Sequence, residues 1–481
     1  MNNSKLIELY KTLQSLEKKH FFNYLENCLK DANAPLLKLN NYISLHLDIE
    51  ETDSLNKKTV FNNLFGKVPY KDKKIRYLMT SLLNHLEHFI AQQKIDKNKL
   101  LLEEQLLIDL KERNLDKHFI GKVVQFSKEL ENKNIHDAGY YYQRFVIERE
   151  RDDYFMKQEI RKDNQSLQLK SDHFEIFFLS EKLKSLCEMV NRTNIIGTEY
   201  ELTMSDEVIA YVKNNLNKFR SVPAIYIYYS IFMSLKEENN SEHFLELKKS
   251  LTTGYKQFSK EEARYMYDYA QNYCIKKLNS GEQKYLQELF LIYETLLSSE
   301  LIFDKSYFSQ WDYKNIVSVG LKLNKYDWTQ HFIEKYKVRI SDEFRENAYH
   351  YNLAFFYYTK KDYKSVLKLL QKVEFTDVYY HLDSKAMLLN MYFELESVEP
   401  FYSLIDAYKV YLARTKKISA YQYQVYQARV KFTKQAFDLK LKTGTIPLAA
   451  KEKAIKKLTD RIQATKIKAD FSWLLERVNE L

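Results

Sequence analysis

The stretch NLAFFYYTKKDYKSVLKLLQKV, Asn352 to Val373, decides how this chain is expected to fold. It holds two short apolar runs, a polar break at Thr359–Asp362 and no glycine. Apolar residues three and four positions apart line one face of an α-helix. The stretch therefore predicts two helices joined by a short turn. A single helical hairpin cannot bury its apolar face alone, so the fold depends on whether this hairpin recurs.

The hairpin does recur in the sequence. Three segments of 21 residues align without a gap, and their starts lie 37 and 35 residues apart: IVSVGLKLNKYDWTQHFIEKY (316–336), LAFFYYTKKDYKSVLKLLQKV (353–373) and LLNMYFELESVEPFYSLIDAY (388–408). Large apolar residues fill the first and eleventh positions, the seventeenth and eighteenth, and the last. We therefore expect Tyr363 and Leu370 of the middle segment to lie inside, between neighbouring helices.

Paired helices with a period of about 34 residues resemble the tetratricopeptide repeat. The middle segment fits that family best, through Leu353, Ala354, Tyr357, Tyr363, Leu370 and Val373. The resemblance covers 312–414 and weakens to general helical-hairpin character over 171–310. It implies stacked hairpins that present a surface to a protein partner. In composition and layout the whole chain also resembles uncharacterised cytoplasmic helical proteins of Bacteroidota, a resemblance that implies no biochemical activity.

The composition favours helices throughout. The 481 residues include only 8 glycines and 5 prolines, which strand-rich folds and positive-φ turns normally use. Charged residues make up 29% and hydrophobic residues 45%, as in a globular protein. We predict an all-α fold with a helix content of about 65% or more, twice the globular average. Its architecture would be a helical-hairpin, tetratricopeptide-like solenoid with an N-terminal helical domain and a basic C-terminal helical cap.

The chain is too long for one ordinary hydrophobic core. Its helical pattern predicts four parts along the sequence. These are an N-terminal helical domain at 1–100, long connecting helices at 101–165, a helical-hairpin array at 166–414 that is tetratricopeptide-like at 312–414, and basic C-terminal helices at 415–481.

One helix pair in the N-terminal domain has the outline of a helix-turn-helix, over residues 54–92. Its second helix would carry Lys73, Lys74 and Arg76 in its first turns, where DNA-reading residues lie in such motifs. The simpler interpretation is a packed helix pair whose basic side chains are solvated, and a lysine-rich chain favours it.

The charge is concentrated near the C-terminus. Residues 409–468 hold 16 Lys or Arg and 3 acidic residues, a net charge of +13, whereas the whole chain carries +10. Tyrosines and Phe432 alternate there with basic residues, which predicts a surface for phosphates or an acidic protein face. The candidate residues, all expected to be solvated, are Arg429, Lys431, Lys434, Lys440 and Lys442. The alternative is a solvated polar cap at the end of the helical array.

The run HDAGYYYQRFVIERERDDYFMKQEIRK, from His136 to Lys162, combines aromatic and charged residues. Tyr140, Tyr141 and Tyr142 invite an interpretation as a stacking platform for bases. Three consecutive tyrosines cannot share one helix face, however. We expect a helix whose aromatic residues pack on neighbouring helices while the charged run at 148–153 faces water.

The sequence lacks the common catalytic motifs. It has no glycine-rich phosphate loop, no H-E-x-x-H and no G-x-S-x-G. Its three cysteines form no metal or disulfide pattern. His85 and His88 have a chelating spacing, yet no third ligand accompanies them, and a packed helix is the preferred interpretation. We therefore expect no enzyme activity, cofactor or metal.

The sequence as a whole predicts a non-enzymatic scaffold for protein–protein interaction. A nucleic-acid-binding or regulatory protein is the alternative, and it would use the basic C-terminal surface or the 54–92 helix pair. A protein partner is expected first and nucleic acid second, and the sequence indicates no oligomeric state. With no signal-peptide core and no apolar stretch of about 18 residues, we expect no membrane association and a cytoplasmic location.

Overall fold

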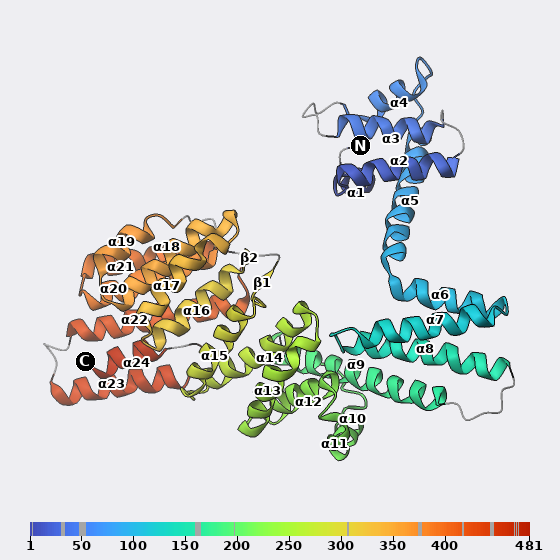
Figure 1. Ribbon diagram of the computed structural model, residues 1–481. Coiled ribbons are helices and arrows are strands. Elements are labelled where there is room, and N and C mark those ends of the chain that lie inside the picture. The colour runs from blue at the N-terminus through green and yellow to red at the C-terminus, as the bar shows by residue number, and fades with distance from the viewer. Residues whose placement is uncertain are drawn as a thin grey trace. The chain divides into compact units, whose positions relative to one another are not determined.

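The computed structural model (Figure 1) describes residues 1, 3–29, 34–47, 54–158, 165–196, 198–304, 307–373, 378–415, 418–442, 447–465, 467, 469 and 471–481. It is 81% helical with 24 α-helices, which confirms the all-α prediction. Two strands of two residues each, β1 (Phe303–Asp304) and β2 (Tyr307–Phe308), form a short antiparallel pair. None of the described helices has both the length and the apolar character needed to cross a membrane.

The chain folds into two compact units. The first comprises residues 1–133 and 142–173, and the second comprises residues 134–141 and 174–481. Helices α8 (Ala138–Lys157) and α9 (Ser166–Ile196) run across the boundary. The other helices of the first unit are α1 (Lys5–Lys11), α2 (Ser15–Leu29), α3 (Pro35–His46), α4 (Lys57–Phe65), α5 (Asp72–Lys97), α6 (Lys99–Glu112) and α7 (Asp116–Glu131).

The second unit is a succession of helices. Its first half contains α10 (Ser205–Asn214), α11 (Leu216–Phe219), α12 (Pro223–Lys236), α13 (Ser241–Gly254), the 3-10 helix η1 (Tyr255–Gln257), α14 (Lys260–Asn279) and α15 (Tyr285–Ser298). After the two strands follow α16 (Gln310–Lys322), α17 (Tyr326–Tyr336), the 3-10 helix η2 (Lys337–Arg339), α18 (Asp342–Thr359), α19 (Tyr363–Leu370), α20 (Val378–Glu394), α21 (Val398–Arg414), α22 (Ala420–Lys442), α23 (Leu448–Gln463) and α24 (Ser472–Asn479).

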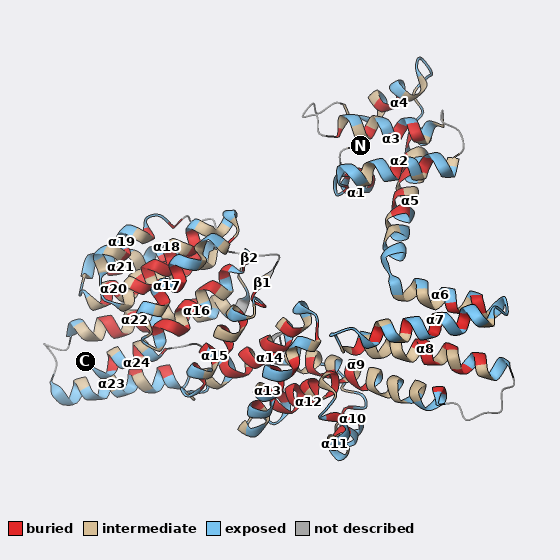
Figure 2. Ribbon diagram, in the orientation of Figure 1, coloured by how far each residue is buried: buried red, intermediate tan, exposed pale blue. Residues whose placement is uncertain are grey.

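The described residues form three hydrophobic cores, which include no buried residue of α6, α7 or α8. One lies within α1–α5 and includes Tyr10, whose hydroxyl donates to Asn40 Oδ1 at 2.9 Å. A second extends from Leu179 to Met391, and a third from Leu382 to Val478, so α20 contributes to both. Helix α12 is buried on nearly all sides (Figure 2). The four-part division of the sequence stays a prediction.

The three aligned segments share one turn. The ninth residue of each, Asn324, Lys361 or Glu396, has a φ between 53° and 60°. Its N–H bonds to the carbonyl three residues earlier, and the next N–H bonds to the carbonyl five residues before it. This pair of hydrogen bonds is the Schellman motif that ends many helices. The gapless alignment therefore corresponds to a repeated backbone geometry.

The same turn occurs twice more. Gly281 separates α14 from α15 with a φ of 96°, and Asn114 separates α6 from α7 with a φ of 58°. Both positions show the two hydrogen bonds of the motif. Two of these five left-handed positions carry Asn, which adopts this conformation more readily than most residues, and two carry Lys or Glu, which normally avoid it. Hence a chain with few glycines still makes the turns of helical hairpins.

Burial follows the alignment in the second half of each segment. The fourteenth and eighteenth residues are buried in all three, and we call this set the hairpin seam: Thr329, Ile333, Val366, Leu370, Phe401 and Ile405. The eleventh residue is the first of its helix and lies beside the turn, so Tyr363 is only half-buried and Val398 is 44% exposed. The expected interior position is confirmed for Leu370, whereas Tyr363 lies at the edge.

The first helices of successive hairpins also pack on one another. Helix α16 contacts α18, α18 contacts α20, and α20 contacts α22. Within the first of these hairpins, α16 and α17 approach closely at Gly320. A Cβ atom at Gly320 would lie 2.3 Å from Thr329 Oγ1. A small residue is therefore required at this helix crossing.

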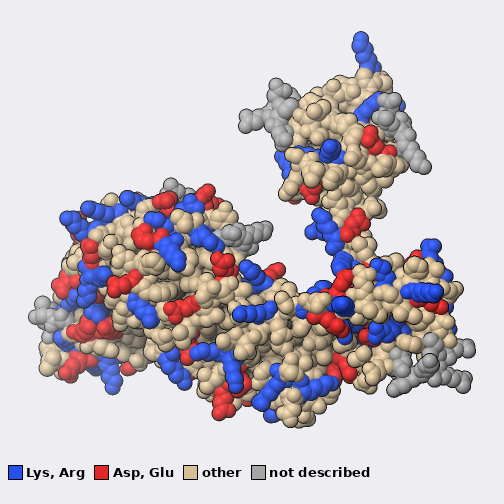
Figure 3. Space-filling model, viewed as in Figure 1, with Lys and Arg blue, Asp and Glu red and all other residues tan. Residues whose placement is uncertain are grey.

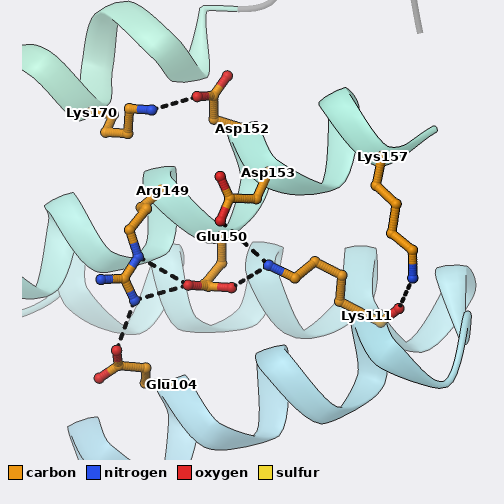
Figure 4. A network of polar contacts seen from close by, with 8 residues as sticks. All are labelled: Glu104, Lys111, Arg149, Glu150, Asp152, Asp153, Lys157 and Lys170. Atoms are coloured by element: carbon orange, nitrogen blue, oxygen red, sulfur yellow. Dashed lines mark hydrogen bonds and ion pairs between the residues drawn. The ribbon is translucent and has the colours of Figure 1, made fainter. Parts of the chain in front are cut away.

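The expectation that the charged run at 148–153 faces water is wrong for its three buried acids, whereas Asp153 is exposed and the two arginines are partly exposed. Glu148 and Glu150 are each 2% exposed and Asp152 is 8% exposed. Lys111 Nζ lies 2.7 Å from Glu150 Oε2, and Arg149 binds the other oxygen of the same carboxylate (Figure 4). Cations supplied by α6 and α9 explain the error, because the sequence of α8 alone does not reveal them. We call this network the ionic seam: Glu104, Lys111, Arg149, Glu150, Asp152, Asp153 and Lys170.

Candidate functional site

The predicted basic residues of α22 do not form one surface. Lys431 and Lys434 line a cavity of about 630 Å³ between α21 and α22, together with Lys409 of α21. Arg429 belongs to the other side of the helix, where its charge opposes the rise in the pKa of Tyr426 that burial and Asp383 cause. Successive residues on a helix point about 100° apart, so positions 429 and 431 face different neighbours.

Three of the five residues are also less exposed than expected. Lys434 Nζ lies 2.7 Å from Asp438 Oδ2, and Lys440 Nζ lies 3.0 Å from Glu396 Oε1. Arg429 is half-buried, while Lys431 and Lys442 are exposed. The expectation that all five are solvated is therefore wrong for Arg429, Lys434 and Lys440. Their acidic or aromatic partners come from the same helix and from its neighbours.

Half of the described, exposed basic residues in the segment 409–468 lie on α23, and the others are Lys409, Arg414, Lys431 and Lys442 on α21 and α22. Lys453, Lys456, Lys457 and Arg461 are exposed on α23, beside the exposed acids Glu452 and Asp460. On the face of the molecule that Figure 3 shows, basic and acidic residues are interspersed. Four lysines of the predicted basic segment lie outside the described residues: Lys416, Lys417, Lys466 and Lys468.

The predicted helix pair at 54–92 corresponds to α4 and α5. Two of its three candidate basic residues contact side chains of the same helix pair. Lys74 Nζ lies 3.6 Å from the centroid of the Phe65 ring. Arg76 Nε lies 2.7 Å from Asp72 Oδ2, one turn earlier on α5. Lys73 is exposed. These contacts accord with the simpler interpretation, a packed helix pair.

Two other candidate groups pack locally. The Tyr24 hydroxyl lies 3.0 Å from His88 Nδ1, and its ring contacts the His85 ring. Among the described residues, no group of three His, Cys, Asp or Glu side chains is placed to hold a metal ion. The rings of Tyr140 and Tyr141 meet edge-on at 5.1 Å between centroids, and burial raises the pKa of Tyr141 to about 12.

A different surface of the second unit has the geometry of a binding site. Two adjoining cavities of about 390 and 650 Å³ share Glu188, Tyr265 and Tyr269. Helices α9, α14, α15 and α16 line the first cavity, and α9, α12, α14 and Tyr200 line the second. We call them together the α14 groove. The ring of Tyr265 is 57% exposed at the place where the cavities meet.

The polar residues of the α14 groove carry a charge imbalance. Arg264 Nη2 lies 3.1 Å from both carboxylate oxygens of Asp312 and 3.1 Å from Asp268 Oδ1. One guanidinium therefore faces two carboxylates. Burial raises the pKa of Asp268 to about 6, and the charge of Arg264 opposes that rise while the charge of Asp312 adds to it. Burial likewise raises the pKa of Asp312.

Amide side chains lie beside these charges. Asn272 Nδ2 of α14 is 3.4 Å from Asn191 Oδ1 of α9, and Asn315 of α16 lines the same cavity. The sequence contains one indication of this site, although neither a run of charged residues nor a catalytic motif marks it. In α14, Arg264, Asp268 and Asn272 recur every four residues between buried tyrosines, so they form a polar stripe along one helix face. The partner residues on α9 and α16 have no such signal.

Comparisons with known proteins supply no relative. No protein-family model, curated protein or solved structure matches the chain.

Proposed function

We propose that the chain is a non-enzymatic scaffold for protein–protein interaction, built on tetratricopeptide-like helical repeats, and that the α14 groove is its partner site. The repeated hairpin turn is the observation that carries this proposal. Because the same Schellman motif recurs at Gly281, Asn324, Lys361 and Glu396, consecutive hairpins enter the stack with the same local geometry. Stacked hairpins leave side chains of successive helices along a continuous surface that a partner can bind.

The α14 groove suits a protein partner because of what lines it. It combines an exposed aromatic ring, Tyr265, with amide and charged side chains from three helices. Aromatic anchors surrounded by polar groups are typical of protein interfaces. The lining residues also come from helices far apart in sequence, so the folded array itself forms the site.

Binding of nucleic acid is a second candidate function, supported by the exposed basic residues of α23. A polyanion complex through Lys453, Lys456, Lys457 and Arg461 would weaken steeply with salt, with a slope in log affinity of about −0.7 to −0.9 per neutralised phosphate. Changing these four residues to Gln should flatten the slope. An unchanged slope, or no binding at low salt, would remove this candidate.

Affinity capture from native cell extract, with and without nuclease, tests the scaffold function. Wild-type chain should retain partners after nuclease treatment, and Tyr265→Glu should lose them because it places a charge at the centre of the groove. Tyr77→Glu is the matched control, since Tyr77 is 76% exposed on α5 and lines neither cavity of the groove. Loss of all partners on nuclease treatment would instead support the nucleic-acid candidate.

A further inference from the structure

Three acidic residues, Glu188, Asp268 and Asp312, and one cation, Arg264, line the first cavity of the α14 groove. Because Glu188 pairs with Arg192 of the second cavity, Asp268 and Asp312 face Arg264 with one negative charge in excess. Arg264 divides its single charge between Asp312, which it holds through both oxygens, and Asp268, whose Oδ1 lies 3.1 Å from Arg264 Nη2. Gln271 Nε2 donates to that same Oδ1 at 3.1 Å.

The other groups around Asp268 also suit a cation. The Asp268 side chain is 37% exposed, and the Asn272 and Asn315 amides beside it carry acceptor oxygens. The exposed ring of Tyr265 offers a face on which an ammonium or guanidinium group can rest. Carboxylate, amide oxygen and aromatic face are the three kinds of group that bind cationic side chains in proteins.

We propose that the α14 groove binds an extended peptide segment of a protein partner and that a lysine or arginine side chain of this segment pairs with Asp268. The inference rests on the proposed scaffold function and names the partner's chemistry. An extended peptide fits better than a free amine for two reasons. The groove continues from the carboxylates into the larger cavity past Tyr265, and α9, α14 and α16 each supply one Asn amide that can match a peptide N–H and C=O.

Four pools of decapeptides, tested on the immobilised full chain, separate this proposal from its rivals. Each pool fixes the central residue as arginine, lysine, citrulline or glutamate and randomises the other positions among uncharged residues. Citrulline keeps the shape of arginine without its charge. The arginine and lysine pools should be retained roughly tenfold better than the citrulline pool, as expected for a charged hydrogen bond. Equal retention of arginine and citrulline pools would overturn the proposal.

The variant Asp268→Asn should abolish the preference for the cationic pools, and Asp406→Asn should keep it, since Asp406 is 80% exposed on α21 and does not line the groove. Asp268→Asn should also melt no lower than the wild type at pH 7. The raised pKa of Asp268 means that its ionised form destabilises the fold at neutral pH. A clearly lower melting temperature would make Asp268 a structural residue and overturn the proposal.

The outcome of this experiment is distinct from that of the capture experiment. If native partners are retained by wild type and by Asp268→Asn alike, the charge pairing proposed here is wrong and the scaffold function stands. If wild-type chain retains no partner, the scaffold function itself fails.

Discussion

The ionic seam of the first unit arises from a run of charged residues, and the hairpin seam of the second unit arises from apolar periodicity, yet both seams contain buried residues. In the ionic seam, Glu150 is 3% exposed in its side chain and is held by Lys111 and Arg149. In the hairpin seam, residues such as Ile333 and Phe401 have no exposed surface. A charged stretch on a helix can therefore be interior when neighbouring helices supply the counter-charges.

The difference decides how each seam stabilises its unit. Apolar side chains gain free energy in proportion to the area that they bury, at about 25 cal/mol per Å². Buried ions must first lose their hydration, and their mutual attraction offsets that cost only when every charge is paired. In the ionic seam, removing one charged partner should therefore lower the stability more than removing side-chain volume does. In the hairpin seam, removing side-chain volume should have the larger effect.

The largest effect is expected from Glu150→Ala. This change leaves Lys111 and Arg149 without the carboxylate that they share, and breaking a buried pair costs about 3–5 kcal/mol. Chemical unfolding, combined with hydrogen exchange to assign the effect to α6 and α8, measures it. Glu112→Ala is the control, because Glu112 is exposed on the same helix as Lys111.

Removing both partners sharpens this test. In Lys111→Met/Glu150→Leu, apolar groups replace the ion pair, so the double variant should be more stable than Glu150→Ala. If the double variant is the less stable of the two, the seam depends on volume rather than on charge pairing, and the contrast with the hairpin seam disappears.

The second prediction concerns the hairpin seam. Leu370→Ala should lower the free energy of unfolding by about 2–5 kcal/mol, because Leu370 is 5% exposed and its removal leaves a cavity. Lys368→Ala, exposed on the same helix, should change it by less than about 0.5 kcal/mol. Thermal unfolding followed by circular dichroism compares the two. Equal effects would show that the hairpin alignment is out of register.

Much of the hairpin fold could be predicted because the spacing of apolar residues can be seen in the sequence of each helix alone. The burial of Leu370 was predicted from a gapless alignment of 21 residues, and the predicted polar break at Thr359–Asp362 contains the left-handed turn residue Lys361. The burial of Glu150 could not be predicted, since Lys111 lies 39 positions away in the sequence. Pairing across helices depends on which helices become neighbours, and periodicity does not contain that information.

The candidate sites show the same limit. Basic residues were easy to count, but the count did not show that Lys440 pairs with Glu396 of the turn between α20 and α21. Nor did it show that Arg429 and Lys431 face different sides of α22. The α14 groove left only a partial trace, the stripe of Arg264 and Asp268 on one helix. Its groups on other helices come from α9, α12, α15 and α16, and the sequence does not show that these helices become neighbours of α14.

A third prediction tests the close helix crossing in the hairpin array. Gly320→Ala should destabilise the second unit by about 1–3 kcal/mol, because the new Cβ would lie 2.3 Å from Thr329 Oγ1. In a Thr329→Ala background that oxygen is absent, and the same change should cost clearly less. A double-mutant cycle in urea measures the coupling. Independent, additive effects would mean that the two helices do not meet at this pair.

The smallest effect is expected at the Schellman turn, which occurs in the first unit at Asn114 and in the second unit at Lys361. Lys361 is exposed and left-handed with a φ of 60°, a conformation that favours glycine. Lys361→Gly should therefore raise the free energy of unfolding by about 0.5–1 kcal/mol, measured as a higher urea midpoint, whereas Lys361→Ala keeps the strain and should give no gain. Asn114→Gly in the first unit should gain less, because Asn tolerates this conformation better and because Asn114 Oδ1 accepts a hydrogen bond from Lys157 Nζ at 2.9 Å. A loss of stability in Lys361→Gly would show that the lysine side chain, and not the backbone, determines this turn. The turns at Lys361 and Asn114 would then have the same backbone geometry for different physical reasons.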